Sequence, residues 1–371
     1  MISQIGTYMS KFLSASLLMD AYRSFRQEVN FRKVIYFCAA LLVVGVFLET
    51  YNFVRAVTPT GKFDSELGWV NPPGRYYDKD ILYSINEEGF RSKKIDQQKP
   101  KIIILGDSIG FGLGVGDQNI FTAYLERQIS GYQVLNLSVN GYGLGQYFLL
   151  LKREIDKFEP RLVIVIICTG NDIRNTTRAE DYGLSKPIFY VGKDGLELSR
   201  KHVSRFSCHN IFSYSWFLKR KPFGWMNQYC SRYFLPVEKK KRVVYQLLRK
   251  IYDLGKSRGV ETLFVLSPSK SNFDEERSIL EFIENAKKKD PENYVQAWLN
   301  SSEFHFKKNL SVFRKLFKDS GMAHLDLAKE LKGGSIDHNS LFLDHYHFSE
   351  IGHKLLASEI KKIVLDLNML K

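Results

Sequence analysis

The sequence contains few cysteines, and their spacing fits neither a metal site nor a redox pair. Cys38, Cys168, Cys208 and Cys230 form no Cys-x-x-Cys motif and no Cys/His ligand pattern. We therefore expect no metal and no other cofactor. Cys208 and Cys230 lie in the same segment and could pair in an oxidising compartment, with four free thiols as the alternative.

A recognisable nucleic-acid-binding motif is also missing, although the formal net charge is +14. Basic clusters occur at 219–221, 239–242 and 287–289, but aromatic residues do not alternate with them in any known binding pattern. Such runs are typical of solvated helix faces or of attraction to anionic lipid or glycan. We expect no nucleic-acid partner.

Long apolar runs are absent except at one place near the amino terminus. Residues 34–48 carry no charge, and with Glu49 at the interface the stretch extends to residue 54, roughly enough to cross a ~30 Å hydrocarbon core. Aromatic residues lie near both ends, as membrane interfaces prefer. The sequence thus predicts a transmembrane anchor over 34–54. A cleavable signal peptide is disfavoured, because 33 residues precede the apolar run.

The charges on either side of this segment indicate its orientation. Basic residues outnumber acidic ones before residue 34, whereas the stretch just after residue 54 is balanced. The positive-inside bias predicts a single-pass protein with a cytoplasmic amino terminus and an extracytoplasmic domain, which would be periplasmic where the cell has a periplasm. Apolar residues at helical spacing in 1–33 indicate an amphipathic helix on the inner membrane surface, or one that packs on a partner.

The remainder of the chain predicts an α/β domain. Residues 55–99 are rich in turn-forming residues and predict an irregular segment. From residue 100 to 371, apolar runs alternate with helical patterns, which predicts a three-layer α/β/α sandwich around a parallel sheet of about five strands. We expect the strands at 101–105, 133–139, 161–168, 261–266 and 323–327, and the helices at 119–129, 145–158, 243–254, 306–317 and 350–367. Two excursions, 175–237 and 269–305, interrupt the alternation as lids or binding loops would.

Small polar residues follow the predicted strands where ligands bind to such sheets. Ser108 follows the first strand in Gly-Asp-Ser, Gly141 follows the second, and Asn171 follows the third in Thr-Gly-Asn-Asp. Asp344 precedes His347 by three residues, just before the last predicted helix. This spacing would let the carboxylate reach Nδ1 while Nε2 faces the serine, which is the arrangement that activates a serine nucleophile.

These four blocks, in this order and spacing, resemble those of the SGNH hydrolases, also called the GDSL esterase and lipase family. The resemblance covers about residues 100–371 without the excursions, and implies a flavodoxin-like fold and an acyl-serine mechanism. It implies Ser108, Asp344 and His347 as the catalytic triad, and Ser108, Gly141 and Asn171 as the oxyanion hole. One departure is Thr169, where the family often has glycine. Leu67-Gly-Trp69 and Gly89-Phe-Arg91 look like the corresponding segment of bacterial membrane-anchored members.

Other titratable residues near these blocks have structural interpretations. Asp107 and Asp172 fit turn-stabilising hydrogen bonds better than catalysis. The histidines outside the motif are expected to pack or to cap, and His345 is the main competitor of His347. These histidines are His202, His338, His345 and His353.

The sequence therefore predicts an extracytoplasmic esterase that acts on an O-acylated glycan or a lipid. An acyltransferase would use the same serine to acylate a surface glycan, and a non-catalytic glycan-binding module would use the fold alone. The sequence does not indicate the oligomeric state.

Overall fold

The computed structural model describes residues 31–56, 61–78, 80–181, 184–193, 195–199, 203, 237–273, 306–332 and 337–370. The chain divides into two units, 1–56 and 57–371. The helix predicted in 1–33 lies almost entirely outside the described residues, as do Cys208 and Cys230, so both predictions remain predictions. Cys38 and Cys168 are free thiols.

In the first unit, helix α2 (Phe31–Ala56) covers the predicted anchor and exposes apolar side chains such as Phe37 and Leu42. Among the residues that the structure describes, no helix is both long enough and apolar enough to cross a membrane. The span predicted over 34–54 is therefore not found.

The second unit is built on a five-stranded parallel sheet, as predicted. The sheet order is β13-β12-β7-β5-β6, and every neighbouring pair is parallel. Strands therefore spread in both directions from β5 and β7, and the carboxyl ends of these two strands flank the crevice where such folds bind ligands. The strands are β5 (Lys101–Leu105), β6 (Gln133–Asn136), β7 (Leu162–Cys168), β12 (Glu261–Ser267) and β13 (His324–Asp326).

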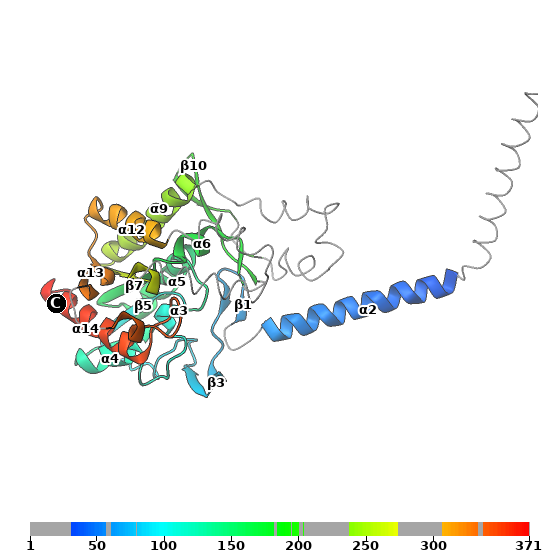
Figure 1. The fold of residues 1–371 in the computed structure, drawn as a ribbon, viewed down its shortest axis with the longest axis horizontal. Helices are drawn as coiled ribbons and strands as arrows, with labels where there is room; N and C mark the ends of the chain where they lie inside the picture. The colour runs from blue at the N-terminus through cyan, green and yellow to red at the C-terminus, as the bar shows by residue number, and fades with distance from the viewer. Residues whose placement is uncertain are drawn as a thin grey trace, which may run out of the picture. The chain divides into compact units, whose positions relative to one another are not determined.

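Helices cover both faces of the sheet, because its strands bury side chains on both sides. In β5, Ile103 and Leu105 join one apolar cluster, while Ile102 and Ile104 join the other. The first cluster includes residues of α5 (Leu144–Phe158), α9 (Val237–Ser257) and α12 (Phe306–Lys318). The second includes residues of α4 (Phe121–Gln128), α13 (Leu327–Leu331) and α14 (Glu350–Asp366). Figure 1 shows α9 and α12 on one side of the strands and α4 and α14 on the other. The result is the predicted three-layer sandwich.

The segment before the sheet is more regular than predicted. It contains two antiparallel pairs, β1 (Lys62–Asp64) with β2 (Gly68–Val70) and β3 (Gly74–Asp78) with β4 (Ile81–Ile85). Asp64 stabilises the first turn, because its Oδ1 accepts hydrogen bonds from the backbone N–H groups of Glu66 and Leu67. Leu67 and Trp69 are 1% exposed and belong to the main apolar cluster. This segment is therefore part of the core.

Short elements occupy the described part of the excursions. The excursion predicted over 175–237 begins within α6 (Asp172–Thr177) and continues with two antiparallel pairs. These are β8 (Glu180–Asp181) with β9 (Leu184–Ser185) and β10 (Phe189–Gly192) with β11 (Gly195–Leu198). The excursion predicted over 269–305 begins with the 3-10 helix η2 (Lys270–Asn272), and residues 274–305 lie outside the described residues. A second 3-10 helix, η4 (His338–Leu341), precedes the Asp344 loop.

Candidate active site

Ser108 lies at the carboxyl end of β5, as predicted, and begins the short helix α3 (Ser108–Phe111). Asp107 caps this helix, since its Oδ1 accepts a hydrogen bond from the N–H of Ile109 at 2.9 Å. A capping carboxylate fixes the backbone of the first turn. Ser108 is 7% exposed, so its hydroxyl is held in a largely enclosed position.

The structure brings His347 and Asp344 to Ser108. Nε2 of His347 lies 2.9 Å from Oγ of Ser108, and Nδ1 of His347 lies 2.7 Å from Oδ2 of Asp344. The other carboxylate oxygen of Asp344 accepts the N–H groups of Tyr346 and His347, both at 2.8 Å. The carboxylate therefore both closes the loop and orients the ring, and Nε2 is left to face the serine.

Backbone pairing closes this loop at its base. Phe342 and Phe348 form an isolated antiparallel bridge, and the N–H of Leu343 donates to the carbonyl of His347 at 2.8 Å. Phe348 is 1% exposed and belongs to the apolar cluster beneath. The position of His347 is thus set by the core as well as by Asp344.

The protonation equilibria of the pair suit a histidine base. Burial raises the pKa of Asp344, but the hydrogen bonds from His347 and Tyr346 and the charge of His347 outweigh burial and lower it to about 2. Burial lowers the pKa of His347, whereas the hydrogen bond and charge of Asp344, with the charge of Asp107, outweigh it and raise the pKa above 6.5. Asp344 therefore stays ionised at neutral pH and stabilises the imidazolium form.

Asn171, at the end of β7, lies beside the serine turn. Its Nδ2 donates to Oδ2 of Asp107 at 3.0 Å, so one carboxylate caps the serine helix and also orients this amide. An amide nitrogen carries two hydrogens, which leaves one donor for another acceptor. Burial raises the pKa of Asp107, although the hydrogen bonds from Ile109 and Asn171 lower it.

Gly141 follows β6 and has a left-handed backbone conformation, with φ at +75°. That conformation favours glycine, because a Cβ would be strained there. The carbonyl of the preceding residue, Asn140, and the carbonyl of Gly141 itself each accept a hydrogen bond from a side chain. The carbonyl of Asn140 accepts the indole N–H of Trp69 at 3.0 Å, and the carbonyl of Gly141 accepts Nζ of Lys186 at 2.8 Å.

The glycine at position 170, next to Asn171, has a steric explanation. A Cβ on Gly170 would lie 2.3 Å from the ring of Tyr346, so glycine makes room for this ring in the His347 loop. The hydroxyl of Thr169 donates to the carbonyl of Ser267 at 2.9 Å and joins the ends of β7 and β12. The turn before Asn171 is therefore packed on both sides.

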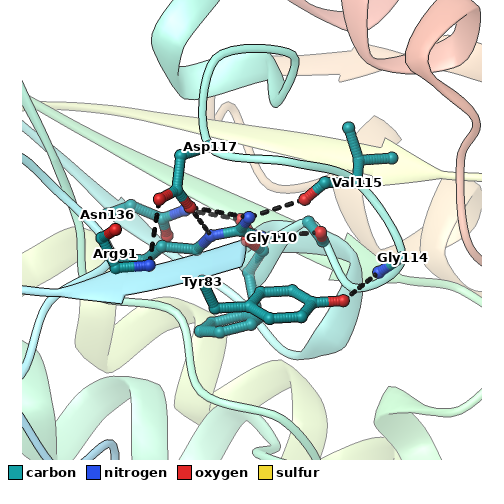
Figure 2. A network of polar contacts seen from close by, with 10 residues as sticks. Tyr83, Arg91, Gly110, Gly114, Val115, Asp117 and Asn136 are labelled. Carbon is teal, nitrogen blue, oxygen red and sulfur yellow. Dashed lines mark hydrogen bonds and ion pairs between the residues drawn. The ribbon is translucent and has the colours of Figure 1, made fainter. Parts of the chain in front are cut away.

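Arg91 holds the chain that follows the serine helix. Its guanidinium donates to the carbonyls of Phe111 at 2.9 Å, Gly112 at 2.7 Å and Val115 at 2.6 Å, and to Oδ1 of Asp117 at 2.9 Å. Figure 2 shows the side chain reaching into this loop. Arg91 is 2% exposed, so these contacts form in an environment that excludes water.

The same network connects the loop to β4 and β6. The ring of Tyr83 lies 4.5 Å from the guanidinium carbon of Arg91, and its hydroxyl accepts the N–H of Gly114 at 3.0 Å, as Figure 2 shows. Asn136 accepts the N–H of Arg91 through its carbonyl and donates from Nδ2 to the carbonyl of Gly110 at 2.9 Å. These contacts thus hold helix α3 and the loop after it against β4 and β6.

Two of the other histidines, His353 and His338, pack against aromatic rings. His353 is 1% exposed, stacks on Phe121, and accepts the N–H of that residue at Nδ1, and burial lowers its pKa to about 3. His338 stacks on Phe273 at 4.3 Å between ring centres. His353 is therefore a core residue, whereas His338 is half-buried and packs on Phe273.

The remaining titratable candidates near the motif are His345, His202 and Asp172. His345 packs edge-on against Tyr346, while the ring that meets Ser108 is that of His347. His202 lies outside the described residues. Asp172 accepts hydrogen bonds from Tyr147 and from the N–H of Cys168, as a structural carboxylate would.

The sequence alone indicates no role for Trp69, Lys186 or Arg91. The motifs around Trp69 and Arg91 are visible in the sequence, but their contacts lie 71 and 26 positions away along the chain. Lys186 stands in a predicted excursion with no local pattern around it. A buried lysine is recognised only when burial is known, and here burial lowers its pKa to about 8.

Comparisons with known proteins give structural neighbours only. No family model and no curated protein matches the chain. A putative lipolytic protein of the G-D-S-L family from Desulfitobacterium hafniense DCB-2 has 12% identity and a TM-score of 0.39, covering 71% of this chain and 99% of that chain. The acetyl xylan esterase AlAXEase has 11% identity and a TM-score of 0.41, covering 71% and 99%. The lipase/acylhydrolase from Enterococcus faecalis has 14% identity and a TM-score of 0.40, covering 71% and 95%.

Proposed function

We propose that the protein is a serine esterase that works through an acyl-serine intermediate. The observation that carries this proposal is the hydrogen-bonded series from Ser108 Oγ to His347 Nε2, at 2.9 Å, and from His347 Nδ1 to Asp344 Oδ2, at 2.7 Å. A serine hydroxyl is a weak nucleophile until a neighbouring base takes its proton, and this geometry supplies that base.

In the first half-reaction, Oγ of Ser108 attacks the ester carbonyl carbon while Nε2 of His347 takes the hydroxyl proton. The carbonyl oxygen becomes an oxyanion, which the N–H groups of Ser108 and Gly141 and the amide of Asn171 would meet. The intermediate then collapses, the bond to the alcohol oxygen breaks, and His347 returns the proton to the leaving alcohol. Asp344 stabilises the imidazolium throughout.

In the second half-reaction, water replaces the alcohol. His347 takes a proton from the water as its oxygen attacks the acyl-serine carbonyl, and the same donors meet the second oxyanion. Collapse breaks the bond to Ser108 Oγ, which recovers its proton from His347. The acid leaves, and the enzyme returns to its starting state.

Hydrolysis of p-nitrophenyl esters of increasing acyl length, together with labelling by a fluorophosphonate, tests this function. We expect the wild-type protein to release p-nitrophenol and to become labelled at Ser108, and Ser108→Ala to do neither. A wild-type protein that neither turns over any ester nor becomes labelled would overturn the proposal in favour of a non-catalytic module.

The substrate is proposed to be an ester on a glycan or a lipid, because the Ser108–His347–Asp344 arrangement suits ester cleavage and the domain is proposed to work outside the cytoplasm. Transfer to an acceptor is separable from hydrolysis in the same assay. With an oligosaccharide present, an esterase yields free acid alone, whereas an acyltransferase yields an acylated sugar that mass spectrometry detects.

We propose in addition that the domain works outside the cytoplasm and is attached to the membrane through its amino-terminal region. The excess of basic residues before residue 34 supports the orientation, and the exposed apolar side chains of α2 support the attachment. A reporter that is active only outside the cytoplasm, fused after Lys371, should be active. An inactive fusion alongside a working cytoplasmic reporter would reverse the assignment.

A further inference from the structure

We infer that Trp69 is a positioning residue for the oxyanion hole, because its indole N–H fixes the peptide group that carries the N–H of Gly141. This inference rests on the proposed function. Trp69 contributes no group to the substrate in this role, and it acts through the backbone of another segment. Its contact with the Asn140 carbonyl spans 71 positions of the chain.

The geometry of a peptide group explains how this works. The carbonyl of Asn140 and the N–H of Gly141 belong to one planar trans unit, so they point in opposite directions. The indole N–H of Trp69 binds this carbonyl at 3.0 Å and holds it on the Trp69 side. The N–H of Gly141 is therefore held on the opposite side, and the peptide cannot flip without breaking a buried hydrogen bond.

The flip is a real alternative at this position. Gly141 has φ at +75° and lacks a Cβ, so little in the residue itself opposes rotation of the peptide before it. A flip would leave a buried carbonyl and a buried indole N–H unpaired, which is unfavourable. The hydrogen bond from Trp69 thus favours one orientation of the Asn140–Gly141 peptide, which the glycine by itself does not.

Trp69 is itself rigidly placed. It is 1% exposed, pairs with Phe63 across β1 and β2, and packs edge-on against Tyr142 with ring centres 5.7 Å apart. The hydroxyl of Tyr142 donates to the Trp69 carbonyl, so strand and loop are joined in both directions. A donor fixed this well can orient its acceptor.

A second side chain holds the next peptide in the same loop. Lys186 is 5% exposed, and its Nζ donates to the carbonyl of Gly141 at 2.8 Å. Gly141 is therefore held through the carbonyl before it and through its own. Lys186 comes from the segment after β9 and Trp69 from β2, and Nζ of Lys186 also lies 5.6 Å from the centre of the Trp69 ring, so the two side chains hold the loop as neighbours.

The decisive variant replaces the indole nitrogen of Trp69 by sulfur, using benzothienylalanine, which keeps the ring shape and removes only the donor. We expect kcat to fall by about 10- to 100-fold with KM unchanged, which is less than the ~100- to 1,000-fold cost of deleting an oxyanion donor. The affinity for an aryl trifluoromethyl ketone, which forms an oxyanion when Ser108 adds to it, should fall by a similar factor. Trp69→Phe and Lys186→Met should show the same split between kcat and KM.

Phe158→Leu is the matched control, because Phe158 belongs to the same apolar cluster at the far end of α5. It should lower thermal stability without changing kcat. If the sulfur variant keeps wild-type kcat and ketone affinity while the wild-type protein is active, Trp69 has no positioning role and the proposed function stands. If the wild-type protein neither reacts with a fluorophosphonate nor hydrolyses an ester, both inferences fail together.

Discussion

Ser108 and His347 are 239 positions apart in the chain, yet Oγ and Nε2 lie 2.9 Å from each other. A separate local hydrogen-bonding contact positions each of the two residues. Asp107 caps the helix that Ser108 begins, and the carboxylate of Asp344 closes the turn that carries His347. The sheet and helix α14 then bring Ser108 and His347 together. Their alignment therefore depends on the fold as well as on the two local contacts.

Removing the nucleophile or the base should abolish turnover. We expect Ser108→Ala to eliminate ester hydrolysis and fluorophosphonate labelling, and His347→Ala to be nearly as severe, since the triad acts as one unit. His345→Ala is the control and should keep activity close to wild type. Loss of activity in His345→Ala with retention in His347→Ala would show that the register of the loop is wrong.

The amide of Asn171 should matter for rate more than for binding. Asn171→Ala should lower kcat by ~100- to 1,000-fold, about 2.7–4 kcal/mol, with little change in KM. Asn339→Ala, an exposed asparagine in η4, controls for handling of the variant. An increase in KM with unchanged kcat would instead assign Asn171 to substrate binding.

The pH dependence of kcat/KM should report the His347–Asp344 pair. Activity requires neutral His347, so kcat/KM should rise with pH through a midpoint above 6.5, because Asp344 and Asp107 raise the pKa of His347. Asp344→Asn removes the charge of Asp344 and leaves burial, which lowers the pKa of His347, as the largest influence. The midpoint should therefore move to lower pH while kcat falls. A midpoint that stays in place in Asp344→Asn would mean that another group controls the profile.

Both members of the pair stabilise the folded state, but their contributions are lost at opposite ends of the pH range. The raised pKa of His347 contributes stability that is present below about pH 6.5 and is lost as pH rises through its folded value. The lowered pKa of Asp344 contributes stability that is present above 3.8 and is lost as pH falls toward about 2. Since the side chain of Asp344 is 55% exposed, we expect its share to be small.

Arg91 should contribute strongly to folding stability. Arg91→Met leaves Asp117 without its buried partner and three backbone carbonyls without their donor, so we expect a loss of ~3–5 kcal/mol in the free energy of unfolding. The surface pair Lys93–Glu126, in which the lysine is 72% exposed, is the control, and Lys93→Met should cost ~0–1 kcal/mol. Equal losses in denaturant unfolding would contradict a special role for Arg91.

Local patterns predicted the framework because continuous apolar runs leave few alternatives. The strand predicted at 101–105 has those bounds in the structure, and all of its residues are buried. The second strand ends at Asn136 instead of 139, although the N–H groups of Leu137 and Val139 still donate to the carbonyls of Ile104 at 2.9 Å and Gly106 at 3.1 Å.

The supporting contacts could not be predicted in the same way. The three-residue strand that carries Trp69 depends on partners 71 and 73 positions away, and no periodicity records such contacts. The Asn171–Asp107 bond joins residues 64 positions apart. The motif residues could be placed at one sheet edge from the strand order alone, whereas their orientation depended on packing that only the folded chain reveals.

The hairpin that carries Trp69 and the turn that carries Arg91 both precede the first strand of the sheet. A fragment that begins at Lys101 would retain Ser108, Asn171 and His347, yet it would lack the donors for the Asn140 carbonyl and for the loop after the serine helix. A fragment trimmed to the four motif blocks would therefore keep every expected catalytic side chain. It would lose the hydrogen bonds that fix the backbone around those side chains. We therefore expect that a fragment which keeps these supporting contacts must start upstream of β1.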